Sequence, residues 1–144
     1  MKLLLTFVFA ILSLFISAQN HSDDLLGEWV NEDTNARIEF FKTGNTYNAK
    51  IIWLAKPQNE NGEQKVDKNN PVKKLRNRPI LGMVILTGLQ FSAKDLMWIS
   101  GKIYSPEKGV TVDCKIRLNN KNEFALIASK GIFSSTKKWK RYDK

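Results

Sequence analysis

Residues 110–118 read VTVDCKIRL, and this stretch decides the fold class of the chain. Apolar residues, Cys114 among them, occupy every second position, and polar or charged residues fill the positions between them. Because side chains alternate between the two faces of a β-strand, the pattern predicts a strand with one buried face. Turn-forming residues precede it at 105–109 and follow it at 119–122. We expect Cys114 to be a buried, unreactive thiol.

The same alternation recurs on both sides of this strand. Residues 36–40 and 47–54 flank the turn signal Thr43-Gly44-Asn45 and predict a hairpin. Further strands are expected at 27–30, 95–104, 124–128 and 137–142. Within 47–54 the shared face is expected to carry Tyr47, Ala49, Ile51 and Trp53.

Residues 80–91, ILGMVILTGLQF, are apolar on both faces and fit either a buried strand or a short helix. Their two glycines and β-branched residues favour a strand, with bends at the glycines. The chain then has about eight short strands and no covering helices, which predicts an all-β fold. We expect a small antiparallel β-barrel of about eight strands, with a two-sheet sandwich as the alternative.

Residues 1–18, MKLLLTFVFAILSLFISA, have the form of a cleaved signal peptide. Lys2 precedes an apolar run at 3–16, and Ala18 is the small residue expected at the cleavage site. A membrane anchor is the alternative, but the run is shorter than the roughly 20 apolar residues that span a bilayer. We therefore expect an exported protein, periplasmic or secreted, with a single domain over 19–144.

Composition narrows the possible chemistry. The 144 residues include one cysteine and one histidine, so neither an intrachain disulfide nor a Cys/His zinc cluster can form. His21 lies just after the expected cleavage site, where termini are usually loose. Residues 67–69 begin like a calcium loop but lack its glycine and distal glutamate. We expect no metal, no cofactor and no catalytic residues, although a carboxylate pair of a hydrolase remains arithmetically possible.

The net charge of +9 is unevenly distributed. The long loop, defined here as residues 56–79, carries seven basic and three acidic residues, a net of +4. The C-terminal segment 130–144 carries six basic residues and one acid, a net of +5. Since an exported protein seldom meets nucleic acid, we expect an anionic envelope component as the partner of such basic patches. A solvated edge strand protected by lysines explains the C-terminal segment equally well.

Two short patterns resemble the lipocalin and wider calycin family. Gly27 and Trp29 open the first expected strand, and Trp139 and Arg141 lie in the last. In that family a Gly-x-Trp motif starts the barrel, and a basic residue of the final strand packs over the tryptophan. The resemblance implies structural roles for these four residues, and a guanidinium over an indole contributes about 0.5–2 kcal/mol.

Longer blocks cover nearly the whole expected domain: DKNNP at 67–71, LRNRPILG at 75–82 and WISGKIYSPEKG at 98–109. Together they resemble the exported bacterial family catalogued as domain of unknown function 2147. The resemblance implies a small lipocalin-like barrel and brings no established activity or catalytic residues. Near the end, residues 130–132 read KGI where the family has an Arg-Gly-Tyr-like stretch.

The long loop allows two interpretations. Arg76 and Arg78 project to one side of an extended segment, where they form a fork suited to carboxylate or phosphate. Alternatively, Asp67 and Asn70 tie the loop to the barrel rim, which makes Asp67 a structural partner of Arg76. Prolines at 71 and 79 stiffen the segment in either case. Asp67, Asn70 and Pro71 are therefore assigned structural roles.

Aromatic residues suggest a second part of a binding site. Trp98, Ser100, Lys102 and Tyr104 are expected to share one face of a strand, opposite an apolar face. If the apolar face points inward, Trp98 and Lys102 form a surface site, and otherwise they line a ligand cavity.

The candidate ligand-binding residues are therefore Arg76, Arg78, Trp98, Lys102 and Tyr104. The cations would contact an anion, and Trp98 and Tyr104 would supply apolar contact. The expected function is binding of a small amphiphile or an anionic envelope component. A protein-interaction module that uses the long loop is the alternative, and a hydrolase is the third reading.

Overall fold

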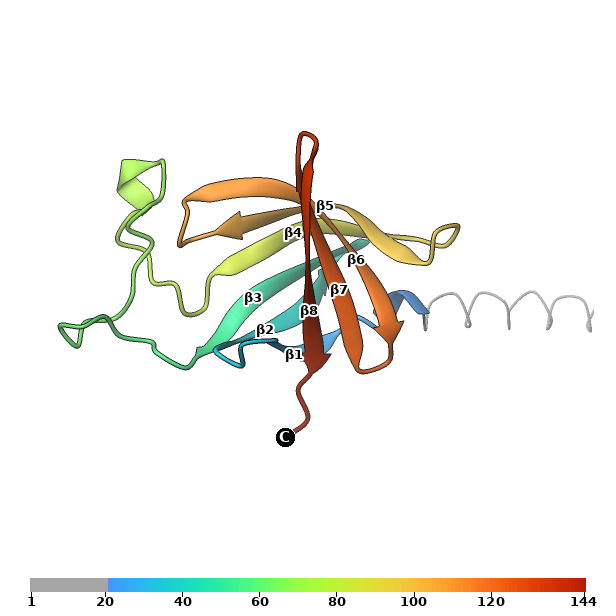
Figure 1. Ribbon diagram of the computed structural model, residues 1–144, viewed down its shortest axis with the longest axis horizontal. Coiled ribbons are helices and arrows are strands. Elements are labelled where there is room, and N and C mark those ends of the chain that lie inside the picture. Colours follow the sequence, from blue (N-terminus) through green and yellow to red (C-terminus); the bar gives the residue numbers. More distant parts are fainter. Residues whose placement is uncertain (1–20) are drawn as a thin grey trace, which may run out of the picture.

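The computed structural model describes residues 21–144, so the predicted signal peptide at 1–18 lies outside the described residues. Eight strands form one closed antiparallel barrel, in which each strand pairs with the next and the last returns to the first (Figure 1). The strands are β1 (Gly27–Asn31), β2 (Ala36–Thr43), β3 (Thr46–Leu54), β4 (Val84–Ser92), β5 (Met97–Ser105), β6 (Val110–Asn120), β7 (Glu123–Lys130) and β8 (Phe133–Arg141). One 3-10 turn, η1 (Lys73–Leu75), lies in the long loop.

The predicted all-β barrel is confirmed, and the sandwich is not formed. Residues 80–91 contain a strand, as the glycines and β-branched residues indicated, but it begins only at Val84. Residues 80–83 form a turn, in which Gly82 donates its N–H to the carbonyl of Ile51. The last strand begins at Phe133, four residues before the expected start at 137.

One bulge overturns the face predicted for Trp53. Ile38 pairs with Ile51, but the next residue toward the start of β2, Arg37, pairs with Trp53. The extra residue in β3, Ile52, moves Trp53 to the outer face, because a one-residue shift reverses the side of every following side chain. There the Arg37 guanidinium lies 5.0 Å from the centre of the Trp53 ring.

A second irregularity separates Trp98 from the face that it was predicted to share with Lys102 and Tyr104. Trp98 pairs with Ile116, and Gly101 pairs with Cys114, so the two intervening residues of β5 form a bulge. Ser100 has a φ of 61° there. Trp98 therefore faces the barrel interior together with Gly101, while Lys102 faces outward, and the shared face predicted from period-two alternation is wrong.

The half of the barrel interior around Trp98 is filled by side chains. Buried aromatic rings interlock there, with Trp29 and Phe124 edge to face at 4.8 Å and Trp139 stacked on Phe124 at 6.1 Å. Gly101 leaves room for its neighbours, since a Cβ atom at this position would lie 2.5 Å from Leu89 Cδ2. This half is a packed core rather than a cavity.

Cys114 belongs to this core and is 5% exposed, which confirms the prediction of a buried thiol. Burial, with a smaller contribution from Asp113, raises the pKa of the Cys114 thiol to about 12. At neutral pH the thiol is therefore protonated and weakly nucleophilic.

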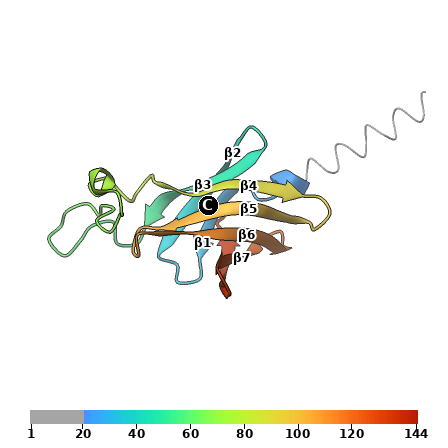
Figure 2. The ribbon, with the colours of Figure 1, turned by 90° about the horizontal axis from the view of Figure 1, so that it is seen from above.

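The two ends of the barrel differ. At the closed end lie the β2–β3, β4–β5 and β6–β7 turns and the segment before β1. At the open end lie the remaining connections, including the long loop, which extends beyond the barrel in Figure 2. None of the segments within 21–144 forms a helix of the length and apolar character needed to cross a bilayer.

Candidate functional site

The closed end is plugged by the contact that the lipocalin resemblance implies. The Arg141 guanidinium lies 4.1 Å from the centre of the buried Trp29 ring. It donates hydrogen bonds to the carbonyls of Leu26 and Asp24, at 3.0 and 2.7 Å. Gly27 has a φ of 111°, and a Cβ atom there would lie 3.2 Å from Arg141 Nη1. Glycine is therefore required next to this plug.

The segment before β1 covers the same end. The Tyr47 hydroxyl donates to Asp23 Oδ1 at 2.6 Å, and Trp98 Nε1 donates to the Ser22 carbonyl at 3.0 Å. The hydrogen bond from Tyr47 and the neighbouring Lys42 lower the pKa of the Asp23 carboxyl, against the opposing effect of its burial. Trp98 is thus a core residue of the closed half.

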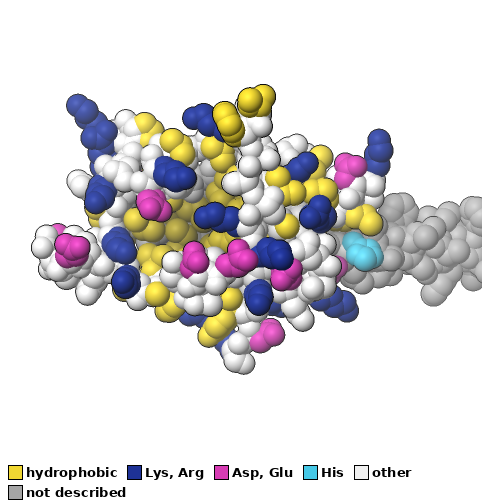
Figure 3. All heavy atoms as spheres, in the orientation of Figure 1, with side chains coloured by type: hydrophobic (Ala, Val, Ile, Leu, Met, Phe, Trp, Pro, Cys, Tyr) yellow, Lys and Arg dark blue, Asp and Glu magenta, His cyan; other side chains and the backbone are white. Residues whose placement is uncertain are grey.

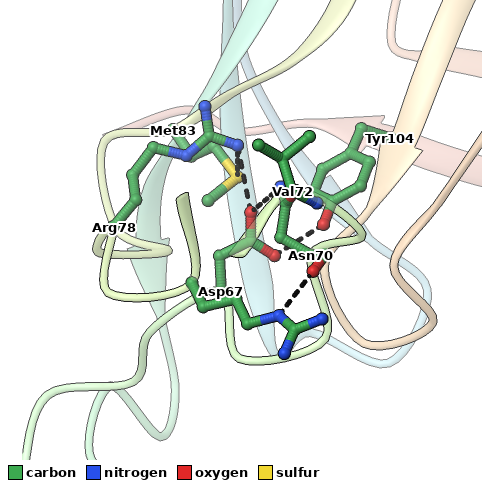
Figure 4. Close-up of polar contacts among 7 residues, drawn as sticks. Asp67, Asn70, Val72, Arg78, Met83 and Tyr104 are labelled. Carbon is green, nitrogen blue, oxygen red and sulfur yellow. Dashed lines mark hydrogen bonds and ion pairs between the residues drawn. The ribbon is translucent and has the colours of Figure 1, made fainter. Parts of the chain in front are cut away.

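A polar cluster centred on Asp67 anchors the long loop (Figure 4). The Asp67 side chain is fully buried. Its Oδ1 accepts from the Tyr104 hydroxyl at 2.6 Å, and its Oδ2 accepts from Asn70 Nδ2 at 2.7 Å and Arg78 Nη2 at 3.0 Å. Met83 Sδ lies 3.7 Å from the same Arg78 nitrogen. Three donors therefore compensate one buried charge.

The electrostatics of this cluster favour the ionised carboxylate. Burial alone raises the pKa of Asp67, but the hydrogen bonds from Tyr104, Asn70 and Arg78 outweigh it, and the pKa lies below its ordinary value. Burial and the hydrogen bond to Asp67 raise the pKa of Tyr104. At neutral pH, Asp67 is an acceptor and Tyr104 a donor.

Backbone contacts extend the anchor on both sides. Asp67 donates its N–H to the Arg78 carbonyl, and Arg76 Nε donates to the Asn70 carbonyl at 2.7 Å. Asn69 Nδ2 donates to the Glu107 carbonyl at 2.6 Å, which joins the loop to the β5–β6 turn. Pro71 follows Asn70 directly. Of the two interpretations of the loop, the contacts agree with anchoring, with Arg78 rather than Arg76 as the partner of Asp67.

The five candidate ligand-binding residues do not form one site. Arg78 and Tyr104 meet at Asp67, and Arg76 lies next to them. Trp98 lies in the closed half of the core. Lys102 forms an ion pair with Asp113 on the outer face. Both loop arginines are exposed residues, so an anion can reach them from solvent.

Lys102 borders an open depression on the outside of β5–β7. Its volume is about 450 Å³, and it is lined by Ile99, Ser100, Gly101, Lys102, Asp113, Cys114, Lys115, Ile127 and Ser129. The bulge at Ser100 contributes to its floor. Because the Lys102–Asp113 pair is itself exposed, the depression offers few uncompensated charges.

A different surface combines apolar and basic groups. The register places Ile103, Val112 and Ala128 on the inner face of the barrel toward the open end, with Ser135 and Lys137 beside them on β8. We call these five residues the open inner face. The three apolar side chains are half-buried, and the two polar ones are exposed. Figure 3 shows a recessed apolar surface between the long loop and the β7–β8 hairpin.

This surface is open because β8 is longer than β1, one of its two partner strands. β1 pairs with β8 only at residues 139–141, so Phe133–Lys138 have no partner strand on that side within the described chain. Lys137 forms no ion pair with any described residue. Farther along the same face, the buried Trp139 Nε1 has no acceptor among residues 21–144. Donors and apolar side chains thus meet on one surface.

Sequence reasoning missed Lys137 and Ser135. The signal was present in the sequence, because residues two positions apart on a strand share a face. Residues 133, 135, 137 and 141 therefore lie on the same face as Trp139. The expected strand began at 137, however, and its lysines were interpreted together, either as a patch for an anionic envelope component or as a solvated edge strand. Among the described residues, no group of three or more His, Cys, Asp or Glu side chains is arranged to hold a metal ion.

Comparison with known proteins agrees with the fold and with the sequence blocks that meet at Asp67. Residues 27–141 match the family described as uncharacterized protein conserved in bacteria (DUF2147). The chain belongs to this family. In the DUF2147 chain, the DKNNP, LRNRP and GKIYSP blocks supply Asp67, Arg78 and Tyr104, so residues far apart in sequence join in one anchor. No curated protein matches the chain.

The DUF2147 chain also resembles solved barrels. The Helicobacter pylori protein HP1028, which belongs to the lipocalin family, is 27% identical, with a TM-score of 0.69 and 83% of each chain covered. A redesigned β-barrel is 16% identical, with a TM-score of 0.47, and 85% of this chain and 96% of that chain are covered. The fold is lipocalin-like, an architecture suited to binding one small ligand.

Proposed function

We propose that this DUF2147 protein binds a small amphiphile with an anionic head group on the open inner face. Apolar contact comes from Ile103, Val112 and Ala128, which are only half-buried in the free protein. Small-ligand sites combine such apolar lining with a few polar groups that fix orientation. The proposal includes export through the signal peptide and binding without catalysis.

The observation that carries the proposal is the position of Lys137. Its register partner is Leu126, a core residue, so Lys137 projects toward the interior although its side chain is exposed. An ammonium group beside an apolar surface suits a carboxylate or phosphate head with an alkyl chain. Ser135 supplies a further donor on the same face.

Titration of the purified protein with oleate tests this arrangement. Lys137→Glu replaces attraction by repulsion and is expected to weaken oleate binding about tenfold. Lys138→Glu is the matched control, since it makes the same charge change on the next residue, whose register partner is Ala125 on the outer face. Affinity within about twofold of wild type is expected for it. Absence of oleate binding, or equal losses in the two variants, contradicts the proposed site.

A second candidate function rests on the anchored loop. Because Asp67 holds a projecting segment with several exposed lysines, the loop has the order that a protein-binding surface requires. Lys73 and Lys74 lie on η1 and are exposed. If the loop binds an acidic partner, Lys73→Glu abolishes a photo-crosslink made from position 74 in envelope extract and leaves oleate affinity unchanged. If both lysines are solvated only, position 74 gives no specific crosslink.

A catalytic role for the buried carboxylate receives no support from its contacts. Both Asp67 oxygens are occupied by donors from within the protein. A general base needs a free position near the proton that it takes.

Export is tested separately: N-terminal sequencing of the protein from the envelope fraction of the producing bacterium is expected to begin at Gln19, whereas an intact Met1 contradicts cleavage.

A further inference from the structure

The β7–β8 hairpin ends in two large apolar side chains that point into water. Ile132 is 94% exposed and Phe133 is 77% exposed. They follow Gly131, whose φ of 61° suits the first position of the two-residue turn closed by the pair Lys130 and Phe133. The hairpin tip stands clear of the barrel in Figure 1. Adjacent exposed apolar residues on a projecting tip commonly mark an interaction site.

Positive charge is distributed along the hairpin that carries this tip. Lys130 precedes the turn, and Lys137, Lys138 and Lys140 follow on β8, all exposed. None of the four lysines has an ion-pair partner among residues 21–144. The segment 130–142 contains no acidic residue at all. A partner that complements the tip is therefore apolar in its interior and anionic at its surface.

A lipid membrane with anionic head groups has this composition. A folded protein partner fits less well, because a specific protein interface buries about 800 Å² per partner and the tip offers two large side chains. Shallow insertion into a bilayer needs only a few apolar groups, supported by nearby lysines.

We infer that the protein docks on anionic membrane surfaces by inserting Ile132 and Phe133, with Lys130, the lysine nearest the tip, at the head groups. Phe133 lies on the same face of β8 as Ser135 and Lys137, so docking places the open inner face next to the lipid. The inference stands on the tip and its charges alone and does not require the proposed ligand site.

A fluorescent label reports insertion directly. Ile132→Cys is labelled with a nitrobenzoxadiazole maleimide, and the buried, protonated Cys114 leaves the new thiol as the reactive one. Leu96→Cys is the matched control, because Leu96 is a 63% exposed apolar residue at the closed end, directly after Lys94 and Asp95. With vesicles of equimolar phosphatidylglycerol and phosphatidylcholine, a blue shift is expected at position 132 and none at position 96.

Vesicle co-sedimentation of unlabelled variants separates the contribution of the apolar tip from that of the positive charge. Ile132→Ser/Phe133→Ser is expected to lower the partition coefficient at least about tenfold, and Leu96→Ser to leave it unchanged. Lys130→Gln is expected to lower it about fivefold, and added salt or pure phosphatidylcholine vesicles to lower it further.

Several outcomes overturn the inference. One is absence of vesicle binding, and another is an equal blue shift at positions 132 and 96. A third is binding that survives Ile132→Ser/Phe133→Ser but not Lys130→Gln, which indicates adsorption by charge alone. A fourth is a shift at position 132 that depends on protein concentration without vesicles, which assigns the tip to a contact between copies of this chain. Circular dichroism of each variant verifies that the barrel is retained.

Discussion

The long loop and the β7–β8 hairpin leave the same end of the barrel, and their segments carry similar charge, +4 over 56–79 and +5 over 130–144. In the loop, Arg78 is committed to a fully buried carboxylate. In the hairpin, four lysines lack ion-pair partners within the described chain, and the tip is apolar. The difference shows that net charge alone does not identify a binding surface. The loop lysines also lack ion-pair partners within the described chain, so the exposed apolar tip is what separates the hairpin from the loop.

The largest contrast is expected in stability. Asp67→Ala removes the acceptor for Tyr104, Asn70 and Arg78 in a buried setting and is expected to lower the free energy of unfolding by about 3–5 kcal/mol. Ile132→Ser/Phe133→Ser changes only exposed side chains and is expected to stay within about 0.5 kcal/mol of wild type. Urea unfolding followed by tryptophan fluorescence measures both. A similar loss in the two variants abolishes the contrast.

A smaller contrast is expected between two glycines with nearly the same backbone conformation. Gly109 and Gly131 have φ values of 66° and 61°. A Cβ atom at Gly109 would lie 1.9 Å from the Asn69 carbonyl oxygen, whereas one at Gly131 would meet nothing within 4 Å. Gly131→Ala is expected to cost about 1–2 kcal/mol from backbone strain alone, and Gly109→Ala about 2 kcal/mol more from the clash.

Equal unfolding midpoints for these two alanine variants would mean that the contact between the long loop and the β5–β6 turn contributes little. That result would weaken the account of the loop as an anchored segment, and it would leave the account of the hairpin intact.

The smallest contrast concerns pH. The pKa of Asp67 is lower in the folded state than in the unfolded chain, where it is about 3.9. The ionised carboxylate therefore stabilises the fold above about pH 4, and this contribution is lost as pH falls through the folded-state value. In Asp67→Asn the free energy of unfolding is expected to fall less steeply as the pH is lowered. Lys138→Gln in the hairpin is expected to leave this pH dependence unchanged. Urea midpoints between neutral and acidic pH test this.

An acid slope that is identical in wild type and Asp67→Asn assigns the acid sensitivity to other carboxylates. Asp23, whose pKa is also lowered, is the alternative source, and Asp23→Asn distinguishes the two because it lies at the closed end.

Much of the fold could be predicted from the sequence because period-two alternation persists through long strands such as β6. Alternation fails where one residue is inserted: the bulge at Ile52 reversed the face expected for Trp53, and the bulge at Ser100 separated Trp98 from the face of Lys102. A bulge depends on the pairing with neighbouring strands, which the pattern of a single strand does not contain.

The candidate site could be predicted only in part. Asp67 and Tyr104 are 37 positions apart, so their hydrogen bond follows from the barrel register and not from either sequence block. The DKNNP block suggested that Asp67 anchors the loop, but the partner expected for it was Arg76, whereas Arg78 holds that position. Lys137 was missed because the strand was expected to begin at 137, although its position two residues before Trp139 places it on the same face.

The most direct test of the contrast is a map of ligand contacts on both regions at once. In amide ¹H–¹⁵N NMR spectra of the protein titrated with oleate, we expect the shifts to concentrate on the open inner face, including Val112, Ser135 and Lys137. The amides of the loop anchor, such as Asp67 and Arg78, are expected to remain unchanged. Shifts that cluster on residues 56–79 instead, with the open inner face unaffected, would contradict the account.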